Sequence, residues 1–413
     1  MKILLIFLFF FVAVLARKGF GDNEQEWGYV EVRKGAYMFW WLHYTTATPD
    51  YTKRPLIIWL QGGPGGSSTA YGNFEELGPL DKNLKPRHTT WIQHANILFV
   101  DNPVGTGFSY VTTGKFATTN EQIAVDFSEL LRSFYKALPK FQDVPLYIFS
   151  ESYGGKMTAE IALHIHEAVQ KKTLNVHLKG IGLGDAYISP LDSTISMASY
   201  LYNMGFLDTN EYHKLELLGN KVKDLLTQKQ WEAAFSANEK LALAIRDFTR
   251  NVDVYNVLTR KGTVVDESCA FCSLKHIMDN VKLSLNLSSE FCSQAVKVYR
   301  TLINDFMKPV THIVERLLNE TDITVAVYNG QLDLIVDTLG VIQWLDKLHF
   351  KAMKDWKDSP KTAFIVNGVV EGFEKKAGNL IFYSVLRSGH MLPADNTNAM
   401  LHILKQVTNN FKV

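Results

Sequence analysis

A short apolar run that leads directly into a serine-centred turn constrains the fold of this chain more than any other feature. Residues 146–149 (LYIF) have the composition of a strand that is buried on both faces. The turn SESYGG follows at once over residues 150–155, and the next segment carries apolar residues at helical spacing. The sequence therefore predicts a strand, a sharp turn and a helix, with Ser152 at the turn. This order is typical of a nucleophile elbow, in which a strained turn exposes the hydroxyl of a reactive serine.

The turn departs from the usual elbow pattern at one position. That pattern is Gly-x-Ser-x-Gly, because small residues let the strand and helix backbones approach closely. Ser150 replaces the first glycine, and serine is the next-smallest polar choice, so the turn can still form. The letters alone also fit a serine in an ordinary helix-capping turn, but the strand before it and the helix after it favour the nucleophile.

Segments typical of strands and helices alternate along most of the chain. Such alternation predicts a mostly parallel sheet covered by helices. Thr119 and Gln122 have the spacing of a capping box at the start of one predicted helix. The further predicted strands are residues 56–60, 97–100, 323–328 and 380–385, with an edge hairpin at 29–44. The predicted helices are residues 119–138, the segment after the elbow, and a last helix over 400–411.

These elements together predict an α/β-hydrolase fold with a central mostly parallel sheet. Residues 188–310 break the alternation with charged amphipathic stretches, and they contain all three cysteines. We expect this segment to be a helical cap inserted over the sheet. The core is then formed by residues 17–187 and 311–413.

The first residues have the pattern of a signal peptide. A lysine precedes an unbroken apolar run from Ile3 to Ala16, and Arg17 and Lys18 follow. The run is short for a membrane-spanning anchor, which is the alternative interpretation. We therefore expect residues 1–16 to be removed and the protein to be secreted or lysosomal, with no membrane span afterwards.

Entry into the secretory pathway gives the cysteines and two asparagines a context. An oxidising compartment allows one disulfide among Cys269, Cys272 and Cys292, and the sequence does not indicate which pair forms. The Cys-x-x-Cys spacing also occurs at zinc and redox sites, but the second ligand pair or thioredoxin-like context is missing. Asn286 and Asn319 stand in glycosylation sequons and are expected at the surface.

Two further residues complete a predicted catalytic triad with Ser152. A nucleophilic serine needs a base, and a histidine base needs a carboxylate that holds its tautomer. Asp333 and His390 follow the predicted strands 323–328 and 380–385, in the order serine, acid, histidine that this fold uses. The carboxyl ends of such strands build the site in α/β sheets. Asp337 is the rival acid, although its segment has the pattern of a helix start that an aspartate caps.

A glycine-rich loop after the strand 56–60 is expected to supply part of an oxyanion hole. Developing negative charge needs fixed backbone donors, usually the N–H after the nucleophile and one from such a loop. Tyr153 supplies the first donor, and we expect Gly63 of the loop QGGPGGSS to supply the second. A phosphate-binding loop is rejected because no lysine followed by serine or threonine comes after the glycines.

The charge balance limits the partners that this chain is expected to bind. Lysine and arginine total 43 against 42 aspartate and glutamate residues, so no strong field draws it to nucleic acid or anionic lipid. The expected partner is a small molecule or a peptide, and no metal or organic cofactor is implied. The sequence leaves open whether the chain forms a homodimer.

The motifs WLQGGPGGSS, DNPVGTGFSY, FSESYGG, YNGQLD and SGHMLP resemble the serine carboxypeptidase family, in order and over nearly the whole mature chain. The forms QGGPGG and SESYGG are especially similar to its retinoid-inducible branch. The resemblance implies the same triad, Ser152, Asp333 and His390, and the same oxyanion donors. It also implies binding of a substrate's C-terminal carboxylate by a set of residues around the loop, which would be Trp59, Gln61, Gly62, Glu75 and Glu151.

Three positions depart from the family pattern: Gln61 replaces an asparagine, Gly66 a cysteine and Ser150 a glycine. The longer Gln61 side chain makes exopeptidase action less secure than the triad. The resemblance implies a serine carboxypeptidase that releases C-terminal amino acids through an acyl-enzyme. The alternatives are an acyltransferase or esterase on this scaffold and a catalytically weak stabilising protein of the secretory pathway.

An acidic working pH follows for Glu75 and Glu151, because at least one of them must be protonated to donate to a bound carboxylate. His390 must stay neutral to act as the base, so we expect its pKa to be depressed in an occluded site.

Overall fold

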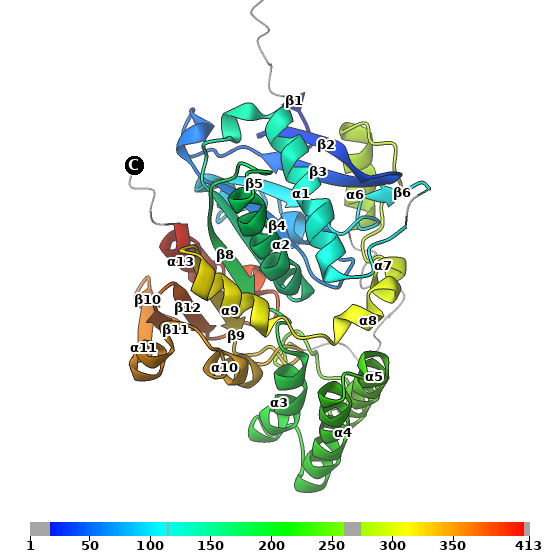
Figure 1. Ribbon diagram of the computed structural model, residues 1–413, viewed down its shortest axis with the longest axis vertical. Helices are drawn as coiled ribbons and strands as arrows, with labels where there is room; N and C mark the ends of the chain where they lie inside the picture. The colour runs from blue at the N-terminus through cyan, green and yellow to red at the C-terminus, as the bar shows by residue number, and fades with distance from the viewer. Residues whose placement is uncertain (1–16, 114, 260–273, 409–413) are drawn as a thin grey trace, which may run out of the picture.

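The computed structural model describes residues 17–113, 115–259 and 274–408 and has one twelve-stranded sheet at its centre (Figure 1). The strand order is β1-β2-β3-β5-β4-β7-β8-β9-β12-β11-β10, and β6 pairs with β3. The strands are β1 (Arg17–Lys18), β2 (Glu24–Arg33), β3 (Ala36–His43), β4 (Leu56–Leu60), β5 (Asn96–Val100), β6 (Tyr110–Val111), β7 (Leu146–Glu151), β8 (Leu178–Gly184), β9 (Thr324–Gly330), β10 (Thr362–Val366), β11 (Val369–Ala377) and β12 (Leu380–Val385).

The middle of this sheet is parallel and its two edges are antiparallel. Every neighbouring pair in the series β5-β4-β7-β8-β9-β12 is parallel. The strands β2 and β3 form the predicted hairpin on one side, and β10 to β12 form a meander on the other. The α/β-hydrolase fold with a mostly parallel sheet is therefore confirmed, and the carboxyl ends of the parallel strands meet at one edge.

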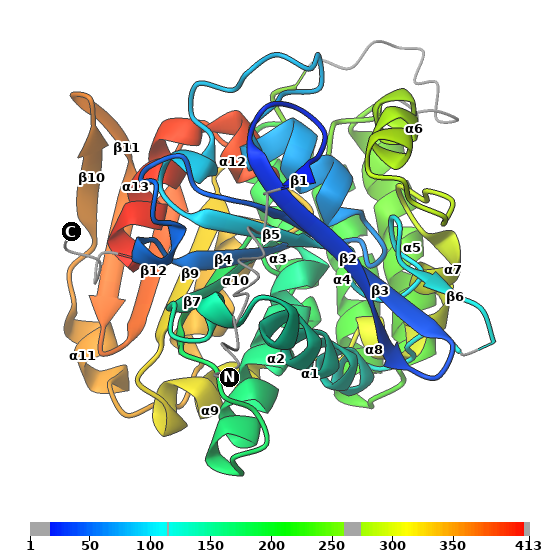
Figure 2. The same ribbon diagram turned by 90° about the horizontal axis from the view of Figure 1, so that it is seen from above.

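Helices cover both faces of the sheet. The helices α1, α2 and α9 pack their apolar residues on one face with α10, and α13 lies on the other (Figure 2). Both layers are rich in fully buried apolar side chains, which explains the periodicity seen in the sequence. The helices of the core are α1 (Asn120–Ala137), α2 (Tyr153–Gln170), α9 (Thr311–Glu320), α10 (Thr338–Asp346), α11 (Met353–Asp358), α12 (Leu392–Asp395) and α13 (Thr397–Thr408), with short helices η1 (Tyr51–Lys53), η2 (Ser68–Leu77), η3 (Trp91–Gln93) and η4 (Pro139–Phe141).

The expected capping box of α1 is only half formed. The Thr119 hydroxyl accepts a hydrogen bond from the backbone N–H of Gln122 at 3.1 Å, as predicted. The Gln122 side chain donates instead to Asp126 at 3.0 Å. Asp126 also binds Arg33 of the edge hairpin, so the glutamine serves a tertiary contact rather than the cap.

The insertion between β8 and α9 is mainly helical in its described part, with non-helical segments at residues 249–259 and 285–295, and it does not form one body over the sheet. The helices α3, α4 and α5 extend away from the core, with α4 and α5 packed together (Figure 1). The helix α6 instead packs its apolar face against the edge hairpin and η2. The division at residues 188–310 therefore stays a prediction about domains. The helices of the insertion are α3 (Pro190–Asn203), α4 (Thr209–Thr227), α5 (Trp231–Phe248), α6 (Lys275–Ser284), α7 (Val296–Thr301) and α8 (Ile303–Phe306).

Most residues on which the prediction of secretion rests lie outside the described part of the chain. Residues 1–16, Cys269 and Cys272 lie outside the described residues. Cys292 is exposed and forms no disulfide with another described residue. Within the described ranges, no helix is long and apolar enough to cross a membrane.

Both predicted glycosylation sites are exposed, and they differ in what their side chains do. Asn286 follows α6 in a turn with φ of 53°. Asn319 donates to the backbone oxygen of His349 at 3.0 Å and accepts from the N–H of Lys351 at 2.8 Å. A glycan on Asn319 would replace one amide hydrogen of a side chain that bridges two segments, so Asn286 is the more accessible acceptor.

Candidate active site

Ser152 sits in a strained turn between β7 and α2. Its backbone has φ of 60° and ψ of −127°, a region that non-glycine residues rarely adopt. Three backbone hydrogen bonds hold this conformation. The Ser152 N–H donates to the backbone oxygen of Gly184 at 2.9 Å, and the backbone oxygen of Ser152 accepts from the N–H groups of Gly155 and Tyr187 at 3.0 Å each. This geometry is that of a nucleophile elbow.

The small residues of the turn are required by close backbone approach. A Cβ atom on Gly154 would lie 2.4 Å from the backbone oxygen of Leu60, and one on Gly155 would lie 2.3 Å from the Cβ of Ala186. Ser150, which replaces the usual first glycine, is fully buried and donates its hydroxyl to the backbone oxygen of Gly182 at 3.1 Å. The serine is therefore accommodated with its polar atom satisfied.

Asp333 and His390 meet at the same edge of the sheet. Asp333 follows β9, His390 follows β12, and their Oδ2 and Nδ1 atoms lie 2.7 Å apart. Both side chains are buried, and the second carboxylate oxygen of Asp333 accepts from the Val336 N–H at 3.1 Å. The bond at Nδ1 leaves Nε2 of the imidazole for the serine hydroxyl, which is the arrangement that a base needs.

The rival acid Asp337 has a structural role. It is the N-cap of α10, where it accepts from the N–H of Gly340 at 3.0 Å and from the hydroxyl of Ser196 at 2.6 Å. The helix start predicted from the sequence is therefore present, and the carboxylate at His390 is that of Asp333.

A cavity of about 490 Å³ lies in front of these residues. Ser152 and His390 both line it, together with Gly63 and Tyr153, the two expected oxyanion donors. Tyr153 is the first residue of α2, where backbone N–H groups have no acceptor within the helix and favour negative charge. Gly63 has φ of 111°, a conformation that suits glycine. Residues of the insertion, among them Tyr299 and Phe306, close the far wall.

Gln61 organises a buried polar cluster beside the nucleophile. Its Oε1 accepts from the indole N–H of Trp59 at 2.8 Å, so its amide nitrogen must face the other way. That nitrogen donates to Oε1 of Glu76 and to Oε1 of Glu151, at 3.0 Å each. Gln61, Gly62 and Glu151 also line the cavity with Ser152.

The glutamate that joins this cluster is Glu76, whereas Glu75 was expected from the sequence. Both belong to η2, but successive residues of a helix point in different directions, and it is the Glu76 side chain that contacts Gln61. Glu76 is fully buried against Gln61, while Glu75 is partly exposed and lines the cavity. The expected partnership of Glu75 with Glu151 is corrected by one residue.

Glu76 and Glu151 form a buried carboxyl pair whose pKa values are both raised. The remaining oxygen of each, Oε2, is buried and has no hydrogen-bond donor among the described residues. Burial raises the pKa of Glu76 to about 7 and raises the pKa of Glu151 well above its ordinary value, and the charge of Glu76 raises the pKa of Glu151 further. Two adjacent buried carboxylates repel each other, so a proton between the two free oxygens is favoured.

Comparison with known proteins shows the family to which a chain with this site belongs. The sequence profile of the serine carboxypeptidase family matches residues 18–410. The chain is a member of the serine carboxypeptidase family. The retinoid-inducible serine carboxypeptidase of Rattus norvegicus is 40% identical over 98% of this chain and 97% of its own length. That of Homo sapiens is 41% identical over 94% of this chain and 92% of its own length.

Solved structures show the same fold. A prohormone-processing carboxypeptidase from Saccharomyces cerevisiae superimposes with a TM-score of 0.84 at 22% identity, over 94% of this chain and 92% of that one. A proline iminopeptidase from Mycobacterium smegmatis superimposes with a TM-score of 0.51 at 14% identity, over 94% and 98%. The chain is thus a serine carboxypeptidase by family and an α/β-hydrolase by fold.

The base of this serine carboxypeptidase lies in a dry environment. Burial lowers the pKa of the His390 imidazole, and the nearby carboxyl groups of Asp185, Glu76 and Asp395 oppose this shift only to the extent that they are ionised. The direction agrees with the expectation from the sequence. His390 can then stay neutral at acidic pH values at which an ordinary histidine would carry a proton.

Asp185 is a buried residue of this site that the sequence interpretation missed. It follows β8 directly, and one oxygen each of Asp185 and Asp333 and a ring nitrogen of His390 lie within 4.8 Å of one another. The signal available in the sequence was its place, since it is an acidic residue at the carboxyl end of a strand. That signal was missed because β8 itself was not predicted.

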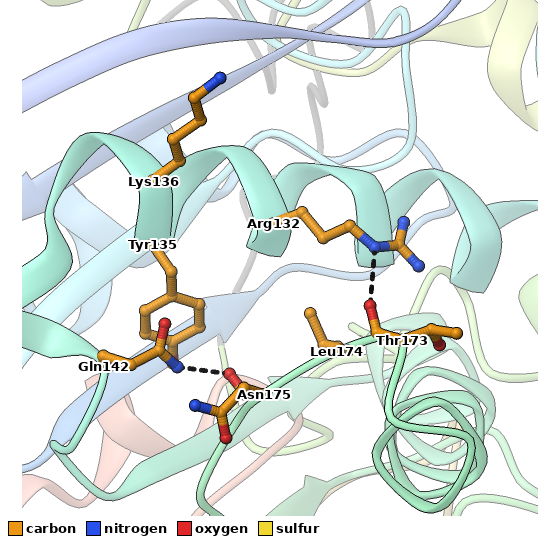
Figure 3. Close-up of a pocket in the computed structure, with 7 residues that line it drawn as sticks. All are labelled: Arg132, Tyr135, Lys136, Gln142, Thr173, Leu174 and Asn175. Carbon is orange, nitrogen blue, oxygen red and sulfur yellow. Dashed lines mark hydrogen bonds between the residues drawn. The ribbon is translucent and has the colours of Figure 1, made fainter.

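A second hollow of about 260 Å³ lies far from this chemistry in the fold, between α1 and the segments that precede β7 and β8. Figure 3 shows Arg132 directed to Thr173 and Gln142 directed to Asn175, while Lys136 points away. These segments precede the strands, whereas the triad follows them. The hollow therefore belongs to the other end of the sheet.

Proposed function

We propose that this serine carboxypeptidase removes single C-terminal residues from peptides through an acyl-enzyme at Ser152. The Ser152 hydroxyl attacks the last peptide carbonyl while His390 takes its proton. His390 then returns the proton to the leaving amino group, and the C–N bond breaks. A water molecule, deprotonated by the same imidazole, hydrolyses the ester and frees Ser152.

Asp333 and the backbone donors assist these steps in different ways. The 2.7 Å bond from Asp333 fixes the imidazole tautomer and stabilises the imidazolium that forms on attack. The N–H groups of Gly63 and Tyr153 are the proposed donors to the oxyanion. Fixed donors of this kind lower the barrier because they need no reorganisation as the charge develops.

The observation that carries the exopeptidase assignment is the buried carboxyl pair Glu76 and Glu151, of which Glu151 lines the catalytic cavity. Both amide hydrogens of Gln61 are already directed to this pair, so Gln61 holds the pair in place. The donors proposed for a substrate carboxylate are the Gly62 N–H and the carboxyl proton, which turns from the neighbouring glutamate to the substrate when the substrate binds. The substitution of glutamine for the family's asparagine is therefore compatible with recognition of a free C-terminus.

The same pair supports a preference for acidic pH. The proton on the pair is lost as pH rises through the raised pKa values, and two carboxylates would then repel the substrate's own carboxylate. His390, with its lowered pKa, remains a base at lower pH than an ordinary histidine. Both properties suit a secreted or lysosomal enzyme, which residues 1–16 also favour.

The direct test is product analysis with a blocked peptide series. Wild-type protein is expected to shorten each peptide by one C-terminal residue at a time, and Ser152→Ala to leave the peptides intact. Endoproteolytic fragments, or transfer of the acyl group to an added alcohol without hydrolysis, would contradict the proposal. Labelling of Ser152 by a serine-directed phosphonate without any trimming would leave a serine hydrolase of another specificity.

A further inference from the structure

We propose that Asp185 is a positioning residue of the triad, which keeps a proton and donates it in a hydrogen bond to Asp333. The inference rests on the proposed catalytic role of Ser152, Asp333 and His390. It adds a second carboxyl pair to the molecule, on the side of the base, distinct from the pair formed by Glu76 and Glu151.

The surroundings of Asp185 assign different tasks to its two oxygens. Oδ1 accepts from the Asn329 side chain and from the Gly330 N–H, at 2.8 Å each. Oδ2 is buried and has no hydrogen-bond donor among the described residues. A bare carboxylate oxygen in that position would be strongly disfavoured, because no water or donor replaces its hydration. A proton on Oδ2 removes the charge and turns this oxygen into a donor.

Asp333 is the acceptor assigned to this donor, because one carboxylate oxygen of each residue lies within 4.8 Å of the other and a side-chain hydrogen bond between the two residues contributes to the pKa shift of each. Its charge is stabilised by the Val336 N–H and by His390, both of which donate to it. Asp185 and Asp333 are fully buried, and no lysine or arginine in the described ranges bonds to either of them. With His390 neutral, two negative charges so close together would be uncompensated, so the pair retains one proton.

The backbone holds Asp185 in place at a cost. Its φ is 42°, in the left-handed region, and its N–H donates to the backbone oxygen of Tyr328 at 2.8 Å. Non-glycine residues adopt this conformation mainly where the surrounding structure imposes it, often at functional sites. The strain here directs the carboxyl group toward the triad.

The location of the proton is supported by the pKa directions. Burial raises the pKa of Asp185 well above its ordinary value, and the charge of Asp333 raises it further. Burial also raises the pKa of Asp333, but the bonds from Val336 and Asp185 oppose that shift. The other titratable groups that face this pair are Glu151, Tyr328, Asp337, Tyr200, Tyr255 and His390.

A neutral Asp185 has a consequence for the base. An ionised Asp185 would place a second negative charge near the imidazole and raise the pKa of His390, so the base would be charged at acidic pH. A protonated Asp185 still orients Asp333 by a hydrogen bond and does not raise that pKa. Asp185 thus lets His390 act at lower pH than a doubly charged site would.

The test compares Asp185→Asn with Asp185→Ala by the rate at which a fluorophosphonate labels Ser152 between pH 4 and 9. This probe has no C-terminal carboxylate, so the reading stands even if the carboxypeptidase proposal fails, and Ser152→Ala reports unspecific labelling. Asparagine can accept from Asn329 and Gly330 and donate to Asp333, as protonated aspartate does. We expect Asp185→Asn to label within about threefold of wild type, since it keeps this bond.

The decisive reading is the acid limb of the labelling rate, which follows the ionisation of His390. We expect Asp185→Asn to leave its inflection where it is in wild type. If Asp185 were ionised, removing its charge would move the inflection to lower pH by about one unit or more. Such a move would overturn the proposal.

Asp185→Ala removes the donor to Asp333 and the acceptor for Asn329 and Gly330. We expect labelling to slow by about 10- to 100-fold, the effect of losing a hydrogen bond to a buried charged group. Asp337→Asn is the matched control, because it alters another buried aspartate near Asp333 and should label at close to the wild-type rate. Equal slowing in both variants, or loss of labelling on adding a chelator, would overturn the assignment of a proton donor at Asp185.

Discussion

At the scale of single residues, the chemistry of this protein depends on where protons are kept in a buried site. We propose that Glu76 and Glu151 share one beside Gln61, and the lowered pKa of the buried His390 favours its neutral form. The sequence predicted the triad by residue type and order, but it placed the carboxyl pair one position off. Adjacent glutamates look alike in a sequence, and only the phase of η2 distinguishes Glu76 from Glu75.

The pair makes a prediction for Glu151→Gln. Wild-type KM for a blocked dipeptide should rise with pH above about 7, by up to about tenfold per unit, because substrate binding then requires proton uptake. Glutamine supplies a permanent N–H donor, so KM of the variant should change little between pH 5 and 9 while kcat keeps the wild-type pH profile. An equal pH slope of KM in both proteins would contradict the shared proton.

At the scale of elements, the strands with continuous apolar residues were predicted and the glycine-rich one was missed. The sequence LKGIGLG of β8 has too few side chains to be recognised as a strand. The structure gives the reason, because a Cβ on Gly182 would lie 2.3 Å from the Phe149 ring and one on Gly184 would lie 2.2 Å from the Tyr328 ring. Large rings on neighbouring strands fill the space over β8, which no local pattern reveals.

The contact between α2 and α8 is a second element-level feature. Lys156, one turn after the nucleophile, is fully buried and donates to the backbone oxygens of Asp305 and Phe306, the latter at 3.0 Å. The Phe306 ring stacks on Tyr153 with centroids 5.6 Å apart and lines the catalytic cavity. One lysine therefore joins the elbow helix of the core to the wall that the insertion provides.

We expect Lys156→Met to lower the free energy of unfolding by about 2 kcal/mol, because two buried carbonyl groups lose their donor. KM should rise more than kcat falls, since the Phe306 wall loosens while the triad stays in place. Lys308→Met is the control: that lysine side chain is 40% exposed, and its partner Asp305 is buried but keeps the hydrogen bond from the Asn120 N–H, so the loss should cost about 1 kcal/mol. Chemical denaturation and steady-state kinetics measure both effects, and equal losses in the two variants would refute the distinction.

At the scale of the whole molecule, an insertion divided between two places was not predictable from amphipathic periodicity. The pattern identified residues 188–310 as helical, but each amphipathic helix could pack on several apolar surfaces. The helix α6 packs against Phe39, Trp41 and Phe74 of the core, while α4 and α5 pack on each other and share an apolar cluster with Leu332 and Leu334. Partner choice depends on tertiary geometry, which a single helix does not encode.

The raised carboxyl pKa values also predict how stability depends on pH. Between pH 4.5 and 7 or above, the folded protein holds protons on Glu76 and Glu151 that the unfolded chain has lost, so this pair stabilises less as pH rises. The lowered pKa of His43, about 3, and of Lys156, about 7, act in the opposite direction over their own ranges. The contribution of the Glu76–Glu151 pair to stability is therefore obtained by comparing wild type with a variant that lacks one of the two carboxyl groups.

The comparison is wild type against Glu151→Gln, by thermal unfolding from pH 5 to 8. Because one group that gains a proton on folding changes the free energy of unfolding by up to about 1.4 kcal/mol per pH unit, the wild-type Tm should fall more steeply with pH. The two curves should diverge toward acidic pH, with wild type the more stable there. Parallel curves would mean that Glu151 is ionised in the folded protein.

The central claim is that this site binds the free C-terminal carboxylate of a peptide next to Ser152. Its most direct measurement is kcat/KM for one blocked peptide as the free acid and as the C-terminal amide, at pH 5 and pH 8. We predict a strong preference for the acid at pH 5 that shrinks at pH 8, where the carboxyl pair loses its proton. Equal rates on acid and amide at pH 5, with Ser152 active in both cases, would contradict the account.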